Sequence, residues 1–277
     1  MLLETLHKLP IIDDCTTFDA PSHTYTVNGI IVPRSVTAVI TDEVTKQDEC
    51  FEADKVIDKN LSTWRSKASS KYHELIRGKD DEEAKETIKA LWDRANKLGT
   101  IMHHAFELTL NGESMPTAYS DGGADDVTKE MHDFQCFRSA FSKLKPHRTE
   151  LCVYGCDAER RPIIAGQIDF VASKKDGSYV IIDFKRTDHN LRYDAFAFGR
   201  KMQGVLNGYA SNDHIRYSFQ TSIYSLLFSD LTGKPVTEKW LLQVHPNLDS
   251  YNLIKCTNFE AEAKQMLLSL GWVPFKN

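Results

Sequence analysis

The segment from Gly166 to Thr187, with the sequence GQIDFVASKKDGSYVIIDFKRT, constrains the fold of this chain more than any other segment. Every second residue from position 168 to position 172 is apolar, as in a half-buried strand. The pair Asp176-Gly177 can supply the positive φ angles of a hairpin turn. The β-branched and aromatic run at residues 179–182 is typical of a buried strand. We therefore expect two strands joined by a tight turn.

Three charged side chains are expected to meet at the end of this hairpin. Asp183 and Lys185 lie two positions apart, so they leave the strand on one face, while Phe184 points to the other face. Asp169 lies on the neighbouring strand and can reach the same place. Two carboxylates and one lysine can hold a divalent cation and orient a water molecule. The structural alternative is a cross-strand ion pair beside a turn.

Composition limits the class of protein. The length of 277 residues allows one large domain, and the contents of 41% hydrophobic and 26% charged residues are ordinary for a globular protein. The net charge of −5 gives no global basic signature, so nucleic-acid binding would need local positive patches. No apolar run is long enough for a membrane span, so we expect no membrane partner. The first residues, MLLETLHKLPIIDD, lack the pattern of a signal peptide.

The six cysteines are scattered and contain no C-x-x-C pair. This spacing argues against a zinc knuckle and against a disulfide framework. We therefore expect an intracellular protein in a reducing compartment, with the finer location left open.

The first 98 residues are expected to form a separate region. Asn28-Gly29 is a strong hairpin signal between strand-like residues 23–27 and 30–32; we expect a structural hairpin, with substrate contact as the alternative. Residues 46–98 are charged and mostly helical, and either pack on the sheet or form an arch over a cleft. Tyr25, Trp64 and Tyr72 are expected to pack in the core, with stacking on nucleobases as the alternative.

Two later helices carry polar side chains on one face. His103 and Glu107 lie four positions apart, and Gly99, one turn earlier, keeps that face open for close approach. In the helix at about residues 214–231, Gln220 and Tyr224 have the same spacing. A buried structural histidine and simple helix packing are the respective alternatives.

Four short motifs follow one another in the chain: Gly-x-x-x-His at 99–103, Gly-x-Ile-Asp at 166–169, Asp-x-Lys at 183–185 and Gln-x-x-x-Tyr at 220–224. Over roughly residues 99–231, this pattern resembles the PD-(D/E)XK nuclease superfamily. It is most similar to the branch with the nuclease domains of bacterial recombination helicase–nucleases, the CRISPR-associated adaptation exonucleases and the mitochondrial genome-maintenance exonuclease, and to phage and large-virus members. Two departures are Ile168, where a proline is usual, and the missing iron–sulfur cysteines of some relatives.

The resemblance implies an α/β fold with a restriction-endonuclease-like core, in which a central mixed sheet is flanked by helices. This core would occupy residues 99–277, preceded by the N-terminal hairpin and helical region of residues 1–98. The resemblance also implies Mg²⁺ or Mn²⁺ as the cofactor, and no iron–sulfur cluster is expected.

The resemblance further assigns roles to individual residues. The metal ligands would be His103, Asp169, Asp183 and the carbonyl of Phe184. Lys185 would orient or help deprotonate the attacking water and stabilise charge on the phosphate. Gln220 and Tyr224 would position Lys185 or the phosphate. Glu150 and Glu107 are expected beside the ligands rather than among them. The catalytic set is therefore Asp169, Asp183, Lys185, Gln220 and Tyr224.

The implied activity is that of a metal-dependent deoxyribonuclease, an exonuclease on single-stranded DNA or DNA ends in replication, recombination or repair. Its partners would be DNA and proteins of replication or recombination. A narrow channel could hold one strand by its phosphates through the basic residues Lys143, Lys145, Arg148, Arg186 and Arg192. An endonuclease, an RNA-cleaving nuclease and an inactive nucleic-acid-binding protein are the alternatives. The intact Asp169, Asp183 and Lys185 favour an active enzyme.

Overall fold

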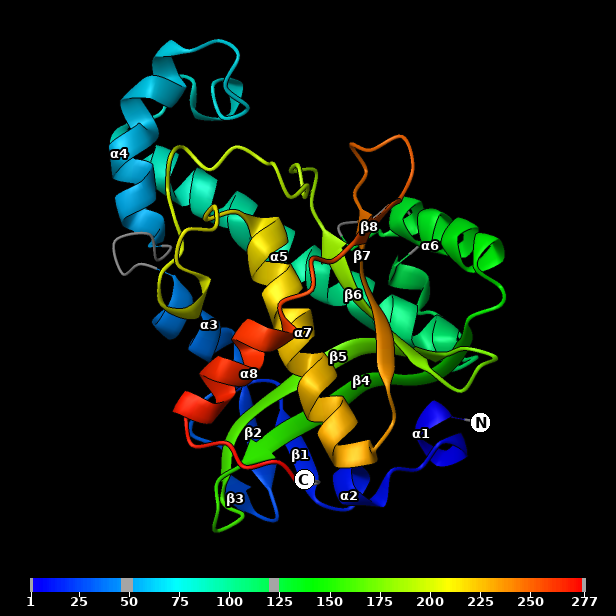
Figure 1. The fold of residues 1–277 in the computed structure, drawn as a ribbon. Helices are drawn as coiled ribbons and strands as arrows, with labels where there is room; N and C mark the ends of the chain where they lie inside the picture. The colour runs from blue at the N-terminus through cyan, green and yellow to red at the C-terminus, as the bar shows by residue number, and fades with distance from the viewer. Residues whose placement is uncertain (1, 46–51, 120–124, 276–277) are drawn as a thin grey trace.

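A five-stranded mixed sheet lies at the centre of the computed structural model, which describes residues 2–45, 52–119 and 125–275 (Figure 1). The strand order follows the chain, and only β6 and β7 run parallel; the other neighbours are antiparallel. The twenty-residue helix α7 (Asp213–Thr232) makes the crossover that a parallel pair requires. The strands are β4 (Lys145–Cys156), β5 (Pro162–Ser173), β6 (Tyr179–Arg186), β7 (Val236–Val244) and β8 (Asn252–Lys255).

Helices cover both faces of this sheet. On one face, α5 (Asp81–Leu110) and α6 (Thr128–Ala140) bury Phe106 and Phe134 against Phe184 of β6. On the other face, α3 (Val36–Val44) and α7 pack on β4 and β5, and α8 (Glu260–Ser269) packs on α7. The α/β fold with a central mixed sheet and flanking helices is therefore confirmed.

The predicted hairpin is β5 and β6. These strands pair from Phe170–Ile182 to Ser173–Tyr179, and Gly177 takes a φ of 82° in the turn. The helix predicted at about residues 214–231 is α7, which begins and ends within one residue of those bounds. The basic residues from Lys145 to Arg148 belong to β4.

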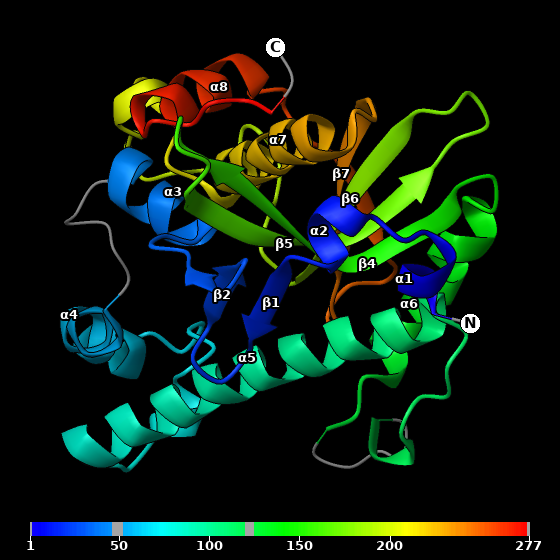
Figure 2. The same cartoon turned by 90° about the horizontal axis from the view of Figure 1, so that it is seen from below.

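The N-terminal region forms a second, small sheet. After α1 (Leu3–Leu6) and α2 (Pro10–Asp13) come β1 (Thr16–Asp19), β2 (Thr24–Val27) and β3 (Ile30–Ile31), all antiparallel. The predicted turn is present, with φ angles of 51° at Asn28 and 76° at Gly29. Figure 2 shows β1 and β2 between α5 and the strands β4 and β5. The small sheet therefore stands beside the central one.

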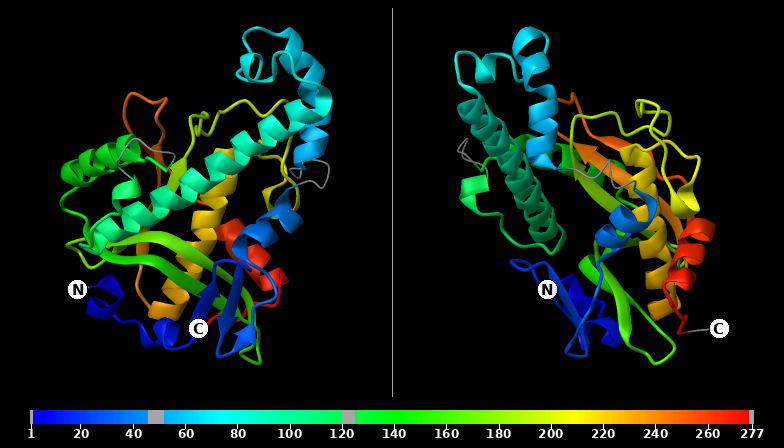
Figure 3. Two further views of the ribbon diagram at one scale, coloured as in Figure 1. Left: turned by 180° about the vertical axis from the view of Figure 1, so that it is seen from behind. Right: turned by 90° about the vertical axis from the view of Figure 1, so that its left-hand side faces the viewer.

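Helix α5 joins the N-terminal region to the rest of the molecule. It begins with a capping box between Asp80 and Glu83 and continues for 30 residues. The predicted division between residues 98 and 99 falls inside this helix. Its first turns pack with α4 (Ala53–Ser66) and with η2 (Glu74–Ile76) in a small core of their own, which extends away from the central sheet (Figure 3). Two short helices, η3 (Thr117–Tyr119) and η4 (Gly204–Leu206), complete the fold.

Trp64 and Tyr72 pack in this small core, where Trp92 Nε1 donates a hydrogen bond to the Tyr72 hydroxyl at 2.9 Å. The five described cysteines are free thiols, and Cys50 lies outside the described residues. Within the described ranges, no helix combines the length and the apolar character needed to cross a membrane.

Candidate active site

The strands β5 and β6 separate beyond the pair Phe170–Ile182, and the charged residues lie where they part. Asp169 is the first residue of β5 past this point. Its Oδ2 accepts a hydrogen bond from the backbone amide of Phe184 at 2.7 Å, in place of a continued strand ladder. Its Oδ1 lies 3.5 Å from Nδ1 of His103 on α5. One carboxylate therefore connects the end of the hairpin to the helix.

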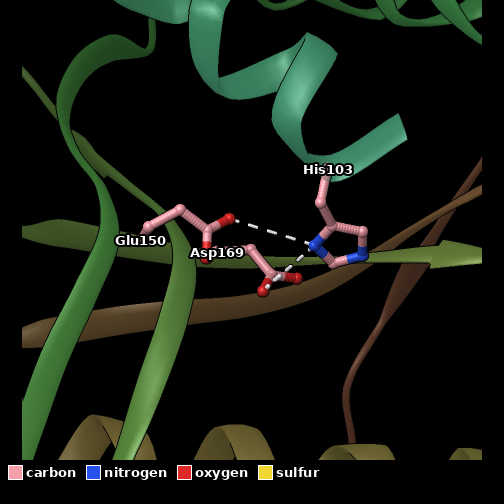
Figure 4. A group of neighbouring side chains, drawn as sticks. All are labelled: His103, Glu150 and Asp169. Carbon is pink, nitrogen blue, oxygen red and sulfur yellow. Dashed lines mark ion pairs between the residues drawn. The ribbon is translucent and has the colours of Figure 1, made fainter. Parts of the chain in front are cut away.

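Three side chains from three elements converge here (Figure 4). His103 Nδ1 also lies 3.9 Å from Oε1 of Glu150 on β4. One ligand atom from each of His103, Glu150 and Asp169 lies within 4.8 Å of the others. Ligand atoms on opposite sides of one Mg²⁺ or Mn²⁺ ion are about 4 Å apart. The group therefore has the spacing and the oxygen and imidazole donors that suit such an ion.

Glu150 has an unusual backbone conformation. Its φ of +44° lies in the left-handed region, which is costly for a residue with a Cβ and is rare inside a strand. Gln167 Nε2 donates a hydrogen bond to its carbonyl at 3.0 Å. Such strain is frequent at functional sites. Glu150, expected only beside the ligands, thus lies in the group itself.

Burial and charge set the protonation of this group. Burial alone would lower the pKa of His103, but the carboxylates of Asp169 and Glu150 raise it to about 9. Burial and the nearby Asp169 raise the pKa of Glu150 to about 8. Burial also opposes ionisation of Asp169, yet His103, Lys185 and the Phe184 amide hold its pKa below the usual range. These shifts favour an ionised Asp169 beside a protonated His103, with Glu150 as the neutral acid near pH 7.

Asp183 and Lys185 form a second pair beside the first group. Lys185 Nζ lies 2.7 Å from Oδ2 of Asp183, and it also stands 4.2 Å from the ring centroid of Tyr217 on α7. Burial disfavours the lysine ammonium, but Asp183, Tyr217 and Asp169 together raise its pKa. Asp183 lies outside the group of three ligand atoms, and its part in metal binding stays a prediction.

Helix α7 supplies the remaining polar side chains. Gln220 Nε2 donates to the Tyr224 hydroxyl at 3.1 Å, so these two residues contact each other rather than Lys185. Tyr217 makes the contact with the lysine instead. Tyr217 lies one turn before Gln220 on this helix, and the predicted catalytic set did not include it. Gly166 is explained by packing, since a Cβ there would lie 2.7 Å from Cε1 of Tyr224.

A cavity of about 880 Å³ opens onto these groups. Its walls come from the central sheet, from α5 and from the N-terminal sheet. Gly99 lies on the α5 wall, and an added Cβ there would meet no atom within 4 Å. The expected open face beside His103 is therefore present. The other site residues on the wall are Glu107, Glu150, Asp169, Phe184, Lys185 and Tyr224.

Phe184 and Glu107 line this cavity, but their side chains lie outside the group of three ligands. The Phe184 ring packs edge-on against His103, with centroids 5.8 Å apart, and its carbonyl as a metal ligand stays a prediction. Glu107 Oε2 lies 3.5 Å from Nδ1 of His104. Neither residue adds a side-chain ligand to the group of three.

The five predicted nucleic-acid contacts do not line one channel. Arg186 lies on the cavity wall, where its Nε is 2.7 Å from Oε1 of the buried Glu130. Arg148 instead makes two hydrogen bonds to Asp13, at 2.9 Å and 2.7 Å, and is buried. Lys143, Lys145 and Arg192 are exposed away from this cavity. A channel formed by all five is therefore not present.

The chain is similar to known proteins in sequence and in structure. The family model of the PD-(D/E)XK nuclease superfamily matches residues 67–269, which include all four sequence motifs. A crystal structure of SSO0001 is 13% identical, with a TM-score of 0.29, over 64% of this chain and 73% of that one. A candidate exonuclease from Eubacterium rectale is 11% identical, with a TM-score of 0.35, over 82% of each chain. Comparison with curated proteins gives no match.

Proposed function

Because the chain belongs to the PD-(D/E)XK nuclease superfamily, we propose that it degrades single-stranded DNA from a free end with Mg²⁺ or Mn²⁺. Family membership makes the chain a nuclease, and members of this superfamily generally use divalent metal ions. The observation that carries the proposal is the meeting of His103, Glu150 and Asp169 with Lys185 on the wall of one cavity.

Each residue of this site would have its own task in phosphodiester hydrolysis. His103, Glu150 and Asp169 would hold the divalent cation. Bound there, such an ion would polarise the phosphate and make a water molecule more acidic. Lys185, held as an ammonium by Asp183 and Tyr217, would orient the phosphate and stabilise its developing charge.

The shape of the cavity favours a single strand that enters by its end as the substrate. Helix α5, the central sheet and the N-terminal sheet all contribute residues to it. A cavity of about 880 Å³ suits a few nucleotides of one strand better than a duplex lying across an open face. Lys185 and Arg186 are the basic residues on the wall that could contact a phosphate, although Arg186 is paired with the buried Glu130.

The test is a time course on circular and linear single-stranded DNA of one sequence, with Mg²⁺, Mn²⁺ or EDTA, and with RNA in parallel. We expect loss of the linear DNA only, with Mn²⁺ at least as effective as Mg²⁺ and no cleavage in EDTA. Rapid cutting of the circle would replace the exonuclease by an endonuclease. A preference for RNA would overturn the DNA assignment, and no cleavage of any substrate would overturn the whole proposal.

A further inference from the structure

The N-terminal sheet brings aromatic side chains to the cavity that holds the candidate ligands. Phe18, His23 and Tyr25 line the same cavity as His103 and Asp169. The family match begins at residue 67, so this sheet lies outside the matched part of the chain. Figure 2 shows β1 and β2 beside α5, the helix that carries His103. The sheet therefore adds a wall to the site that the family match does not include.

The three rings form one contiguous cluster. Phe18 stacks on Tyr25 with ring centroids 4.5 Å apart and an interplanar angle of 27°. His23 meets both rings edge-on, at 5.3 Å from Phe18 and 5.8 Å from Tyr25. Tyr25 is buried, whereas Phe18 is half-buried and His23 is exposed. Tyr25 thus supports the other two rings from the core, and they remain accessible from the cavity.

The turn before β2 holds the exposed ring in place. His23 has a φ of +51°, and its amide donates a hydrogen bond to the Ala20 carbonyl at 3.3 Å. Asp19 Oδ2 accepts the Ser22 amide at 3.0 Å and closes the same turn. The left-handed conformation is uncommon for a histidine and carries some strain. The turn is therefore ordered by its own hydrogen bonds.

We propose that this sheet binds an unpaired nucleobase of the substrate at Phe18 and His23, while the neighbouring phosphate lies at the group of His103, Glu150 and Asp169. Because the two rings are perpendicular, the base would stack on one of them and meet the other edge-on. The inference rests on the proposed function. It adds the feature by which the site would distinguish a single strand from a duplex. Aromatic rings stack on the flat faces of bases with little regard to sequence. In a duplex those faces are covered by the adjacent base pairs. The substrate class is therefore single-stranded nucleic acid of any sequence.

The test measures binding separately from cleavage. A short fluorescein-labelled oligothymidylate is titrated in EDTA, and fluorescence anisotropy gives the Kd. A second probe has the same sugar–phosphate backbone without bases. We expect the wild type to bind the complete strand about tenfold more tightly than the abasic one. Phe18→Ala and His23→Ala should weaken binding of the complete strand and leave binding of the abasic strand unchanged.

Further variants separate stacking from folding. Phe18→Leu keeps an apolar side chain against Tyr25 but removes the aromatic face, so it should keep the melting temperature and still lose the preference. Phe196 is 79% exposed and does not line the cavity, so Phe196→Ala is the matched control and should bind like the wild type. Equal wild-type affinity for the two probes, or equal weakening of both by Phe18→Leu, would overturn the inference. The wild type could still cleave linear single-stranded DNA in that case. A failure of this inference can therefore be distinguished from a failure of the proposed function.

Discussion

One oxygen of the Asp169 carboxylate accepts the backbone amide of Phe184 at 2.7 Å, at the point where β5 and β6 part. The other oxygen faces His103 at 3.5 Å. The same side chain therefore closes the hairpin and offers a ligand atom. Because the two tasks use different oxygens, substitutions can separate them.

Asp169→Asn should fold and lack activity, whereas Asp169→Ala should also lose stability. The asparagine oxygen can still accept the Phe184 amide, but its NH₂ group cannot ligate a cation. Alanine leaves that buried amide without its partner, at a cost of about 1–3 kcal/mol. Thermal melting without metal and cleavage assays with Mn²⁺ provide the comparison. Equal melting temperatures for the two variants would mean that the hydrogen bond to Phe184 contributes nothing measurable.

His103→Ala should weaken Mn²⁺ binding and lower cleavage by about 10²-fold while the protein stays folded. The imidazole lies between two carboxylates, and its removal leaves only oxygen ligands. Isothermal titration with Mn²⁺ measures the affinity directly. His132→Ala on α6 removes an exposed histidine outside the site and is the control. A much lower melting temperature combined with normal cleavage would assign His103 a structural role.

Lys185→Ala should reduce cleavage by about 10²-fold or more and leave Mn²⁺ and DNA binding largely intact. The ammonium pairs with Asp183 and lies over Tyr217, and we expect it to act on the phosphate or the water and not as a metal ligand. Lys174→Ala is the matched control, since that lysine opens the turn of the same hairpin and pairs with Glu238 of β7 at 2.7 Å. Single-turnover rates at saturating Mn²⁺ decide the matter. Wild-type rates for Lys185→Ala would leave the pair with Asp183 as a purely structural contact.

Glu150→Gly should stabilise the metal-free protein more than Glu150→Gln does, and both should lose Mn²⁺ affinity. Glutamine removes the buried ionisable group but keeps the backbone at a positive φ. Glycine also removes the strain, which is worth about 1 kcal/mol and raises the melting temperature by about 2–4 °C. Differential scanning calorimetry at neutral pH without metal compares the two variants. If Glu150→Gly melts at a lower temperature than Glu150→Gln, the left-handed backbone at residue 150 does not destabilise the protein.

The strands and turns of this fold could be predicted because the sequence patterns that specify them lie within short segments. The period of two in β5 and β6, the Asp176-Gly177 turn and the Asn28-Gly29 turn all act within a few residues. The geometry of the site could not be predicted from such local signals. The φ of Glu150 and the contact between Tyr217 and Lys185 depend on how distant elements pack, and no sequence pattern encodes them.

Two other differences have the same origin. Arg148 was predicted to contact nucleic acid, but its partner Asp13 lies 135 residues earlier and comes close only in the folded chain. The boundary at residues 98 and 99 was placed at Gly99, yet one glycine costs a helix only about 1 kcal/mol. Packing of the following turns against Phe134 and Phe184 offsets that cost, so α5 continues through it.

Gly99→Ala should make the protein more stable and less active. Alanine favours a helix over glycine by about 1 kcal/mol, and the added methyl group meets no atom within 4 Å in the free protein. The melting temperature should therefore rise by about 2–4 °C. The methyl group would nevertheless occupy the cavity wall one turn before His103, where we expect the substrate strand to approach. A small displacement of the reacting phosphate is enough to slow cleavage on the order of tenfold to 10²-fold. Thr87→Ala, at a half-buried position of the same helix outside the cavity, also raises helix propensity and should leave cleavage unchanged. Melting curves and cleavage rates on linear single-stranded DNA are measured for both variants. If Gly99→Ala is stabilised and cleaves like the wild type, the substrate does not approach this face, and the glycine is no part of the active site.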